Sequence, residues 1–289
     1  MNRPPRAPAF RTLLILGRAS NLPTVWSNCL AGFLLGGGGD LWRLLTFSLG
    51  ATLLYTGGMF LNDAFDADFD HQHRSERPIP SGAIALAQVW RFGFAFLVAG
   101  LLIGGWMHRS TALLTLLLAA CIVLYDAIHK AVVFAPVLMA LCRFFLFLAA
   151  ASIGTLGVSG LAVWSAFALA FYIIGLSYLA RQESLRGPLR YWPLLCLVAP
   201  VALAWTVNSG SFRPAATALI LCQLGWSGWC LYHTFSTTQR NIGHTVSGLL
   251  AGIVLVDLLA LNPRDAGVLV TFCALFVGAR LFQRFIPAT

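Results

Sequence analysis

Long apolar segments separated by short polar loops run through almost the whole chain. A helix that crosses a bilayer needs about 20 mostly apolar residues. Ten segments approach this length, with bounds at roughly 18–38, 42–62, 88–107, 111–128, 132–153, 161–180, 191–207, 213–233, 247–261 and 266–284. The pattern predicts an all-α fold, a polytopic membrane bundle that forms one domain over residues 1–289.

Composition supports a membrane protein and excludes several other classes. Of the 289 residues, 58% are hydrophobic and 10% are charged, whereas a soluble domain has about a quarter charged residues. The net charge of +9 is scattered over short loops, so we expect no nucleic-acid partner. The seven cysteines fall in apolar segments without paired ligand spacing, which argues against disulfides and a zinc site. The basic, Pro-rich residues 1–11 precede no recognisable cleavage site, so we expect no removable signal peptide.

The distribution of basic residues predicts the orientation in the membrane. Fourteen Lys and Arg residues lie on the side that carries the loop after residue 62, four lie on the opposite side, and Arg143 lies inside a segment. Cytoplasmic loops carry the excess of positive charge. We therefore expect a bacterial inner-membrane protein with residues 62–82 at the cytoplasmic face.

An acidic stretch follows the second apolar segment. Asn62, Asp66 and Asp70 stand at i, i+4 and i+8, and Asp63 and Asp70 stand seven residues apart, whereas Asp68 points elsewhere. If the helix continues through them, the first four share one face. So many carboxylates repel one another unless a cation lies between them, and oxygen ligands suit Mg²⁺ bound together with substrate phosphates. A solvated helix end is the alternative, but acids at a membrane helix end are costly and usually functional.

The stretch and the loop after it resemble a known motif. The pattern N-D-x-x-D-x-x-x-D, followed by Arg77 and the sequence P-I-P-S-G, resembles the first aspartate-rich motif of the UbiA family of intramembrane prenyltransferases. The resemblance implies a UbiA-like bundle, usually of nine transmembrane helices, so we expect nine or ten. It also implies a prenyl diphosphate substrate, with Asn62, Asp66 and Asp70 as Mg²⁺ ligands, Asp63, Asp66 and Asp70 as catalytic residues, and Arg77 as a diphosphate contact.

Four further residues match family positions. Arg18 and Asn21, at the start of the first segment, loosely match an Arg and an Asn that the family places there. The guanidinium fork of Arg18 suits a diphosphate, although an ordinary positive-inside anchor is equally compatible. Tyr125 and Lys130, after the fourth segment, match a Tyr–Lys pair, which implies that Lys130 neutralises diphosphate charge. The spacing between Tyr125 and Lys130 differs from the family pattern by one residue, so His129 is an alternative to Lys130 at this position. Lys130 could instead extend its ammonium to the membrane interface.

Arg143 lies near the middle of the fifth apolar segment. A charge at that depth is costly and normally faces a polar cavity or a charged partner. Two interpretations follow. Arg143 contacts the diphosphate, or it pairs with Asp257 inside the ninth segment.

The second aspartate-rich motif of the family belongs after the sixth segment, where this chain departs from the pattern. The chain offers Arg181, Gln182, Glu183 and Ser184, with Glu183 as the one acid. Either Glu183 alone holds a second ion, or Arg181 replaces the metal charge, or the protein binds its substrate without catalysis. The variant sequence resembles the EboC-like subgroup of the family.

The resemblance implies transfer of an allylic prenyl group to a small acceptor, with diphosphate as the leaving group. The acceptor class stays open among an aromatic compound, a tetrapyrrole, a sugar and a cyclitol. The alternatives are a non-catalytic prenyl-diphosphate or lipid-binding protein and an ion-coupled transporter, with which the buried charges at Arg143 and Asp257 are compatible.

Overall fold

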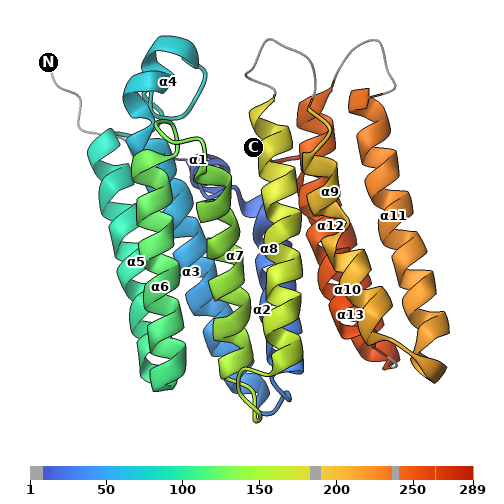
Figure 1. Cartoon of the computed structure of the whole chain (residues 1–289). Coiled ribbons are helices and arrows are strands. Elements are labelled where there is room, and N and C mark those ends of the chain that lie inside the picture. Colours follow the sequence, from blue (N-terminus) through green and yellow to red (C-terminus); the bar gives the residue numbers. More distant parts are fainter. Residues whose placement is uncertain (1–8, 183–189, 236–240, 264, 289) are drawn as a thin grey trace, which may run out of the picture.

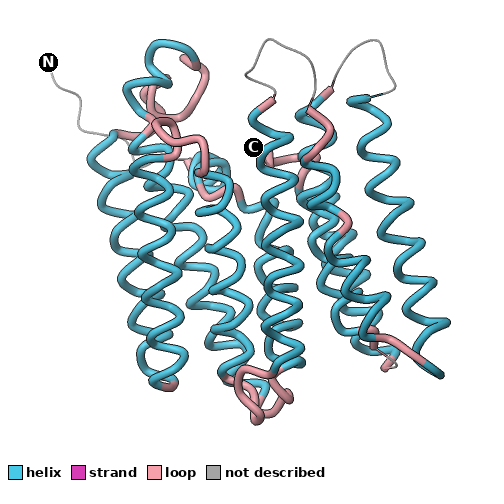
Figure 2. The backbone as a smooth tube through the Cα atoms, in the orientation of Figure 1, coloured by secondary structure: helices cyan, strands magenta, loops and turns pink. Residues whose placement is uncertain are grey.

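The computed structural model describes residues 9–182, 190–235, 241–263 and 265–288. Every regular element in these ranges is a helix, as Figure 2 shows. In chain order the elements are α1 (Phe10–Leu16), the 3₁₀ helix η1 (Ala19–Asn21), α2 (Leu22–Leu35), α3 (Leu41–Phe65), α4 (Ala67–His73), α5 (Leu86–Met107), α6 (Arg109–Ile128), α7 (Ala135–Ser152), α8 (Gly160–Arg181), α9 (Pro193–Leu197), α10 (Ala199–Val207), the 3₁₀ helix η2 (Gly210–Phe212), α11 (Arg213–Phe235), α12 (Ile242–Leu261) and α13 (Ala266–Phe282).

The long helices run side by side in a bundle, with α4 at one end (Figure 1). The connections after α2 and after α7 meet at the opposite end, where the Thr155 N–H donates to the carbonyl oxygen of Gly38 at 2.9 Å. Six described helices are long and apolar enough to cross a membrane: α3, α5, α6, α7, α8 and α12. The described chain is therefore an all-helical bundle suited to a bilayer.

Each of the ten apolar segments contains a helix in the structure, and the two largest differences from the sequence-based bounds lie in the second half of the chain. The segment at 191–207 is split into α9 and α10 because Pro200 has no N–H to donate one turn back. The segment at 247–261 belongs to a longer helix, since α12 begins at Ile242. Polar residues such as His244 and Thr245 begin that helix, so hydropathy alone placed its start too late.

Small residues hold α3 close to α5 and so fix the position of the acidic stretch at the end of α3. A Cβ atom on Gly57 would lie 2.9 Å from the carbonyl oxygen of Gly93, and a Cβ on Gly93 would lie 2.8 Å from the side chain of Leu61. Neither contact leaves room for a larger residue. Membrane helices commonly approach each other through such small residues, because lipid supplies no hydrophobic drive between them.

Candidate functional site

The acidic stretch forms the junction between α3 and α4. The shared face was inferred on the condition that one helix continues through residues 62–70, but α3 ends at Phe65 and α4 begins at Ala67. The backbone ladder nevertheless persists, because Asp66 N–H donates to Asn62 O and Asp70 N–H donates to Asp66 O. The junction therefore keeps the expected spacing, and the side chains of Asn62, Asp63, Asp66 and Asp70 are buried while Asp68 is exposed.

The loop after α4 folds back and places Arg77 over two of these carboxylates. Its Nη1 atom donates to Asp70 Oδ2 at 3.0 Å and to Asp63 Oδ1 at 3.3 Å. Ile79 and Ile84 anchor the loop in an apolar cluster that also contains Phe60 at the end of α3. The sequence prediction that Arg77 belongs with the acidic stretch agrees with this placement.

Asp66 contacts the end of α6. Its Oδ1 atom lies 2.7 Å from Lys130 Nζ and 3.4 Å from His129 Nε2. Burial alone would raise the pKa of the Asp66 carboxyl, but hydrogen bonds from His129 and Lys130 hold that pKa below its usual value. Burial alone would likewise lower the pKa of His129, yet the hydrogen bond to Asp66 raises it. His129 thus belongs to the cluster together with Lys130, whereas the sequence treated it as a loop residue and a rival of Lys130.

Lys130 is held from a second direction as well. Its Nζ atom lies 4.1 Å from the centroid of the Phe69 ring, and that ring stacks on His73. A cation over an aromatic face is attracted by the ring quadrupole. The ammonium is thereby positioned between α4 and Asp66, although its side chain is partly exposed.

Arg18 reaches the acidic stretch from the connection between α1 and α2. It takes up a left-handed backbone conformation with φ at +41°, which is costly for a residue with a Cβ and often marks a functional site. Its Nη2 atom donates to Asn62 Oδ1 at 3.3 Å and lies 3.7 Å from Asp63 Oδ1. The structure therefore brings Arg18 to the motif, and its contact with a diphosphate stays a prediction.

Asn21 and Tyr125 lie beside this cluster and make other contacts. Asn21 is buried, and its amide donates to the carbonyl oxygen of Ala288 at 2.9 Å, which ties the end of the chain to η1. The Tyr125 ring stacks on His129 with centroids 5.0 Å apart. Neither residue contacts a carboxylate of the motif in a bond that the structure records, so their predicted substrate contacts stay predictions.

Asp126 is a member of the site that the sequence analysis missed. It lies in the last turn of α6, four residues before Lys130, and is only 3% exposed. Its Oδ1 atom accepts a hydrogen bond of 3.1 Å from the Asn62 amide. The signal was present, because an acid in the last turn of an apolar helix is costly by itself. Its partner Asn62 lies 64 residues away, and sequence spacing gave no means of pairing the two.

Arg143 belongs to a separate buried network beneath the site. Its Nη1 atom donates to Asn28 Oδ1 at 2.7 Å and to the Thr24 carbonyl, and its Nη2 atom donates to the Thr24 hydroxyl. The Asn28 amide and the Ser27 hydroxyl donate to Asp257 Oδ2 at 2.7 and 2.6 Å. Of the two interpretations, the structure favours the link to Asp257, with Asn28 of α2 as a bridge between α7 and α12.

Arg181 holds the loop that follows Lys130 instead of facing the acidic stretch. Its Nη1 atom donates to the carbonyl oxygens of Val132 and Val133 at 3.1 and 2.8 Å, and the Tyr178 hydroxyl donates to Val133 as well. The structure therefore does not bring Arg181 to the acidic stretch, and its predicted contact with the substrate stays a prediction. Glu183 lies outside the described residues.

The residues at the end of α3 and in α4 offer the donors that a hard cation prefers. Among the described residues, no three His, Cys, Asp or Glu side chains form a group that could hold a metal ion. Arg77 and Lys130 lie against the carboxylates instead. Two buried oxygens, Asp70 Oδ1 and Asp126 Oδ2, nevertheless have no hydrogen-bond partner in the part of the chain that the structure describes. Carboxylate and amide oxygens suit Mg²⁺, so the donor chemistry fits this ion.

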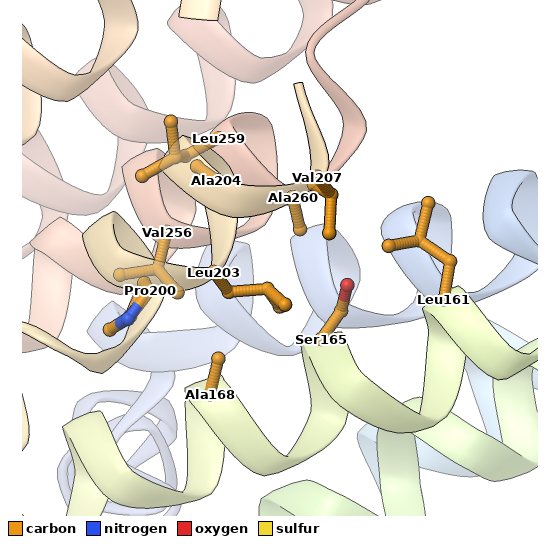
Figure 3. A pocket seen from close by; sticks show the side chains of 10 residues that line it. All are labelled: Leu161, Ser165, Ala168, Pro200, Leu203, Ala204, Val207, Val256, Leu259 and Ala260. Atoms are coloured by element: carbon orange, nitrogen blue, oxygen red, sulfur yellow. The ribbon is translucent and has the colours of Figure 1, made fainter. Parts of the chain in front are cut away.

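A small apolar pocket lies at the other end of the bundle, between α8, α10 and α12 (Figure 3). Ser165 is its single polar side chain among residues 161, 165, 168, 200, 203, 204, 207, 256, 259 and 260. The pocket is lined by no charged group and by none of the residues at the acidic stretch. It therefore offers no chemistry of its own.

Comparisons with known proteins agree with this geometry. Residues 22–187 match the sequence profile described as "UbiA prenyltransferase family". A digeranylgeranylglyceryl phosphate synthase of Methanothrix thermoacetophila is 36% identical over 120 residues, which are 40% of this chain and 44% of that protein. A 4-hydroxybenzoate octaprenyltransferase of Aeromonas salmonicida is 40% identical over 80 residues, which are 27% of this chain and 25% of that protein. The chain thus spans less than half the length of these curated relatives.

Solved structures show the same fold at low sequence identity. A structure described as concerning digeranylgeranylglyceryl phosphate synthase in membranes superposes with a TM-score of 0.61 at 18% identity, covering 93% of this chain and 97% of that one. A UbiA homolog from Archaeoglobus fulgidus, bound to DMAPP and Mg²⁺, gives a TM-score of 0.53 at 16% identity and covers 95% of this chain and 97% of that one. Since the sequence profile covers more than half of the chain, the protein belongs to the UbiA prenyltransferase family.

Proposed function

We propose that this protein transfers a prenyl group from an allylic prenyl diphosphate to a small acceptor, within one transmembrane domain over residues 1–289. The observation that carries the proposal is the cluster at one end of the bundle, where buried Asp63, Asp66 and Asp70 meet Arg77 and Lys130. The carboxylates suit a bound metal cation, and the neighbouring cationic side chains suit the phosphate oxygens of a diphosphate. The relatives support the donor class, because their names denote prenyl transfer and one solved homolog holds DMAPP and Mg²⁺.

The barrier of this reaction is the separation of charge when diphosphate leaves an allyl cation. Positive groups that are fixed in advance stabilise the developing negative charge without reorganisation. Mg²⁺ bound through Asn62, Asp66 and Asp70 would supply Lewis-acid stabilisation of the leaving group. Arg77 and Lys130 would then turn from the carboxylates to the phosphate oxygens, since an arginine fork and a lysine ammonium both suit phosphate.

The other residues of the cluster have supporting roles in this proposal. Arg18 lies near enough to Asn62 and Asp63 to reach a diphosphate held there. Asn21 and Tyr125 flank the same region and complete the substrate-binding set. Arg143 lies outside the cluster, with its guanidinium 5.9 Å from the centroid of the Tyr55 ring. In this proposal it supports the site indirectly, through its hydrogen bonds to Asn28 and Thr24.

Incubation of the purified protein with labelled prenyl diphosphate and candidate acceptors tests the proposal. We expect release of diphosphate that depends on a divalent cation and stops in excess chelator. Tight binding of prenyl diphosphate without turnover on aromatic, tetrapyrrole, sugar or cyclitol acceptors would show a binding protein instead. Absence of any binding, with ion-dependent uptake of a solute into proteoliposomes, would favour the transporter.

We also propose nine or ten membrane crossings in the bacterial inner membrane, with the acidic stretch in the cytoplasm. The fourteen-to-four distribution of basic residues supports this orientation. In a cysteine-free background, a cysteine at exposed Ser75 should react with an impermeant reagent only from the cytoplasmic side. A cysteine at exposed Ser209, at the opposite end of the bundle, is the matched control and should react only from outside. The reverse labelling pattern would refute the orientation.

Glu183 is proposed as the acid that holds a second ion. Glu183→Gln keeps the shape of the side chain and removes its charge. We expect turnover to fall more than prenyl-diphosphate binding, because the first motif and the arginines still bind the diphosphate while the transition state loses a stabiliser. Unchanged turnover would mean that one metal site, or arginine charge, suffices.

A further inference from the structure

Asp126 is a buried acidic residue with no role in the proposed reaction as described above. Its side chain is 3% exposed in the last turn of α6. An acid in a membrane helix is costly unless it is paired or coordinates an ion. The recorded side-chain hydrogen bond that it makes is the one accepted by Oδ1 from the Asn62 amide, and its Oδ2 atom has no partner among the described residues.

The hydrogen bonds around Asn62 fix which way its amide points. Arg18 can only donate, so it requires the Asn62 oxygen on its side, where the two atoms are 3.3 Å apart. The Asn62 NH₂ group then lies on the opposite side, where it donates to Asp126 Oδ1 at 3.1 Å. The two contacts agree, and together they form a chain from Arg18 through Asn62 to Asp126 that spans η1, α3 and α6.

This orientation matters because only the oxygen of Asn62 can bind a cation. If the amide turned over, its NH₂ group would face the guanidinium of Arg18 and the side of Asp63. A donor there repels both a metal ion and an arginine. Some groups do not touch the metal but orient a metal ligand through a hydrogen bond. Removing such a group typically lowers metal affinity or activity by about 10–100-fold.

We propose that Asp126 is a positioning residue that holds the Asn62 amide with its oxygen toward the cation and the diphosphate. The inference rests on the proposed function, since it assigns Asn62 the role of a metal ligand. It adds a carboxylate from α6 behind the set of Asn62, Asp66 and Asp70 that the first motif implies as metal ligands.

Mn²⁺ binding tests the proposal without turnover. The affinity of the purified full-length protein for Mn²⁺ is measured by electron paramagnetic resonance in saturating inorganic diphosphate. Asp126→Leu should weaken Mn²⁺ binding by about 10–100-fold. Asp126→Asn should bind far more tightly than Asp126→Leu, because its amide oxygen still accepts from Asn62. Thr115→Val is the matched control, since Thr115 is buried on the same helix about 16 Å away and should leave Mn²⁺ binding unchanged.

A double substitution separates positioning from a direct or purely structural role. In an Asn62→Ala background, Asp126→Leu should cause no further loss of Mn²⁺ affinity, because residues that act through one another are not additive. A further tenfold loss there, or an equal loss in Asp126→Asn and Asp126→Leu, would overturn the proposal and make the Asp126 charge itself the active feature. Asp126→Asn preserves the side-chain volume and the acceptor oxygen, so it decides the question if Asp126→Leu fails to fold. Near-normal Mn²⁺ binding by Asp126→Asn supports positioning, and a tenfold loss in that variant overturns it.

The outcome also distinguishes this inference from the proposed function. If the unaltered protein binds no Mn²⁺ in the presence of diphosphate, the proposed function fails. If it binds Mn²⁺ and Asp126→Leu binds equally well, the proposed function stands and the role of Asp126 is refuted.

Discussion

Asp66→Ala is expected to reduce diphosphate release by at least about 100-fold, the range seen when one preorganised electrostatic group is removed from an active site. Asp66 lies at the junction of α3 and α4, and its carboxylate contacts both Lys130 and His129. Those two contacts keep its pKa low, so the group is ionised and ready to bind a cation at neutral pH. Its loss removes a metal ligand and frees Lys130 from its position.

Asp68→Ala provides the matched control for this experiment. Asp68 belongs to the same acidic stretch and lies two residues away, but its side chain is exposed on α4. We expect its substitution to leave diphosphate release close to that of the unaltered protein. Equal losses in both variants would mean that general negative charge at this end of the bundle matters, and unimpaired Asp66→Ala would remove this site from the mechanism.

Arg143→Met is expected to lower the stability of the bundle by about 3 kcal/mol, because buried acceptors lose a charged hydrogen-bond donor and a buried carboxylate loses the charge linked to it through Asn28. The substitution deprives the Asn28 and Thr24 oxygens of their donor. It also leaves Asp257, which is fully buried, without the positive charge that reaches it through Asn28. The unfolding transition of the purified protein in detergent measures the loss.

Two further variants make the result specific. Arg91→Met removes a guanidinium from an exposed position on α5 and should leave the transition almost unchanged. Combining Arg143→Met with Asp257→Asn should recover part of the lost stability, because the uncompensated carboxylate is then neutral. A normal transition with Arg143→Met, together with a large rise in the KM for prenyl diphosphate, would favour the diphosphate contact over the structural network.

The relation between Asp63 and Asp70 shows how far local spacing reaches. The sequence placed these two carboxylates on one face of a helix, and a single guanidinium of Arg77 contacts both. The helix is interrupted at Asp66, between α3 and α4, but the i→i−4 bonds at Asp66 and Asp70 preserve the periodicity. Helical periodicity within about ten residues was therefore sufficient to predict that Asp63 and Asp70 lie on the same side.

His129 and Lys130 show where local spacing fails. Helical position and family likeness left the two as rivals for one role, and the structure places both against the same Asp66 oxygen. The helix of α6 ends at Ile128, so both residues lie past its last turn and can turn to the same side. The course of the backbone after a helix end depends on what it packs against, and here Arg181 of α8 holds the following loop.

The sequence by itself determined the all-helical membrane bundle, the bounds of most helices and the acidic stretch with Arg77, because hydropathy and helical periodicity are local properties. Only the tertiary structure decided that Asn62 bonds to Asp126, that Arg143 reaches Asp257 through Asn28, and that Arg181 binds backbone carbonyls. These partners lie 48 to 229 residues apart. Which helices become neighbours depends on close contacts such as those of Gly57 and Gly93, and these follow from the packing of the whole bundle rather than from any one segment.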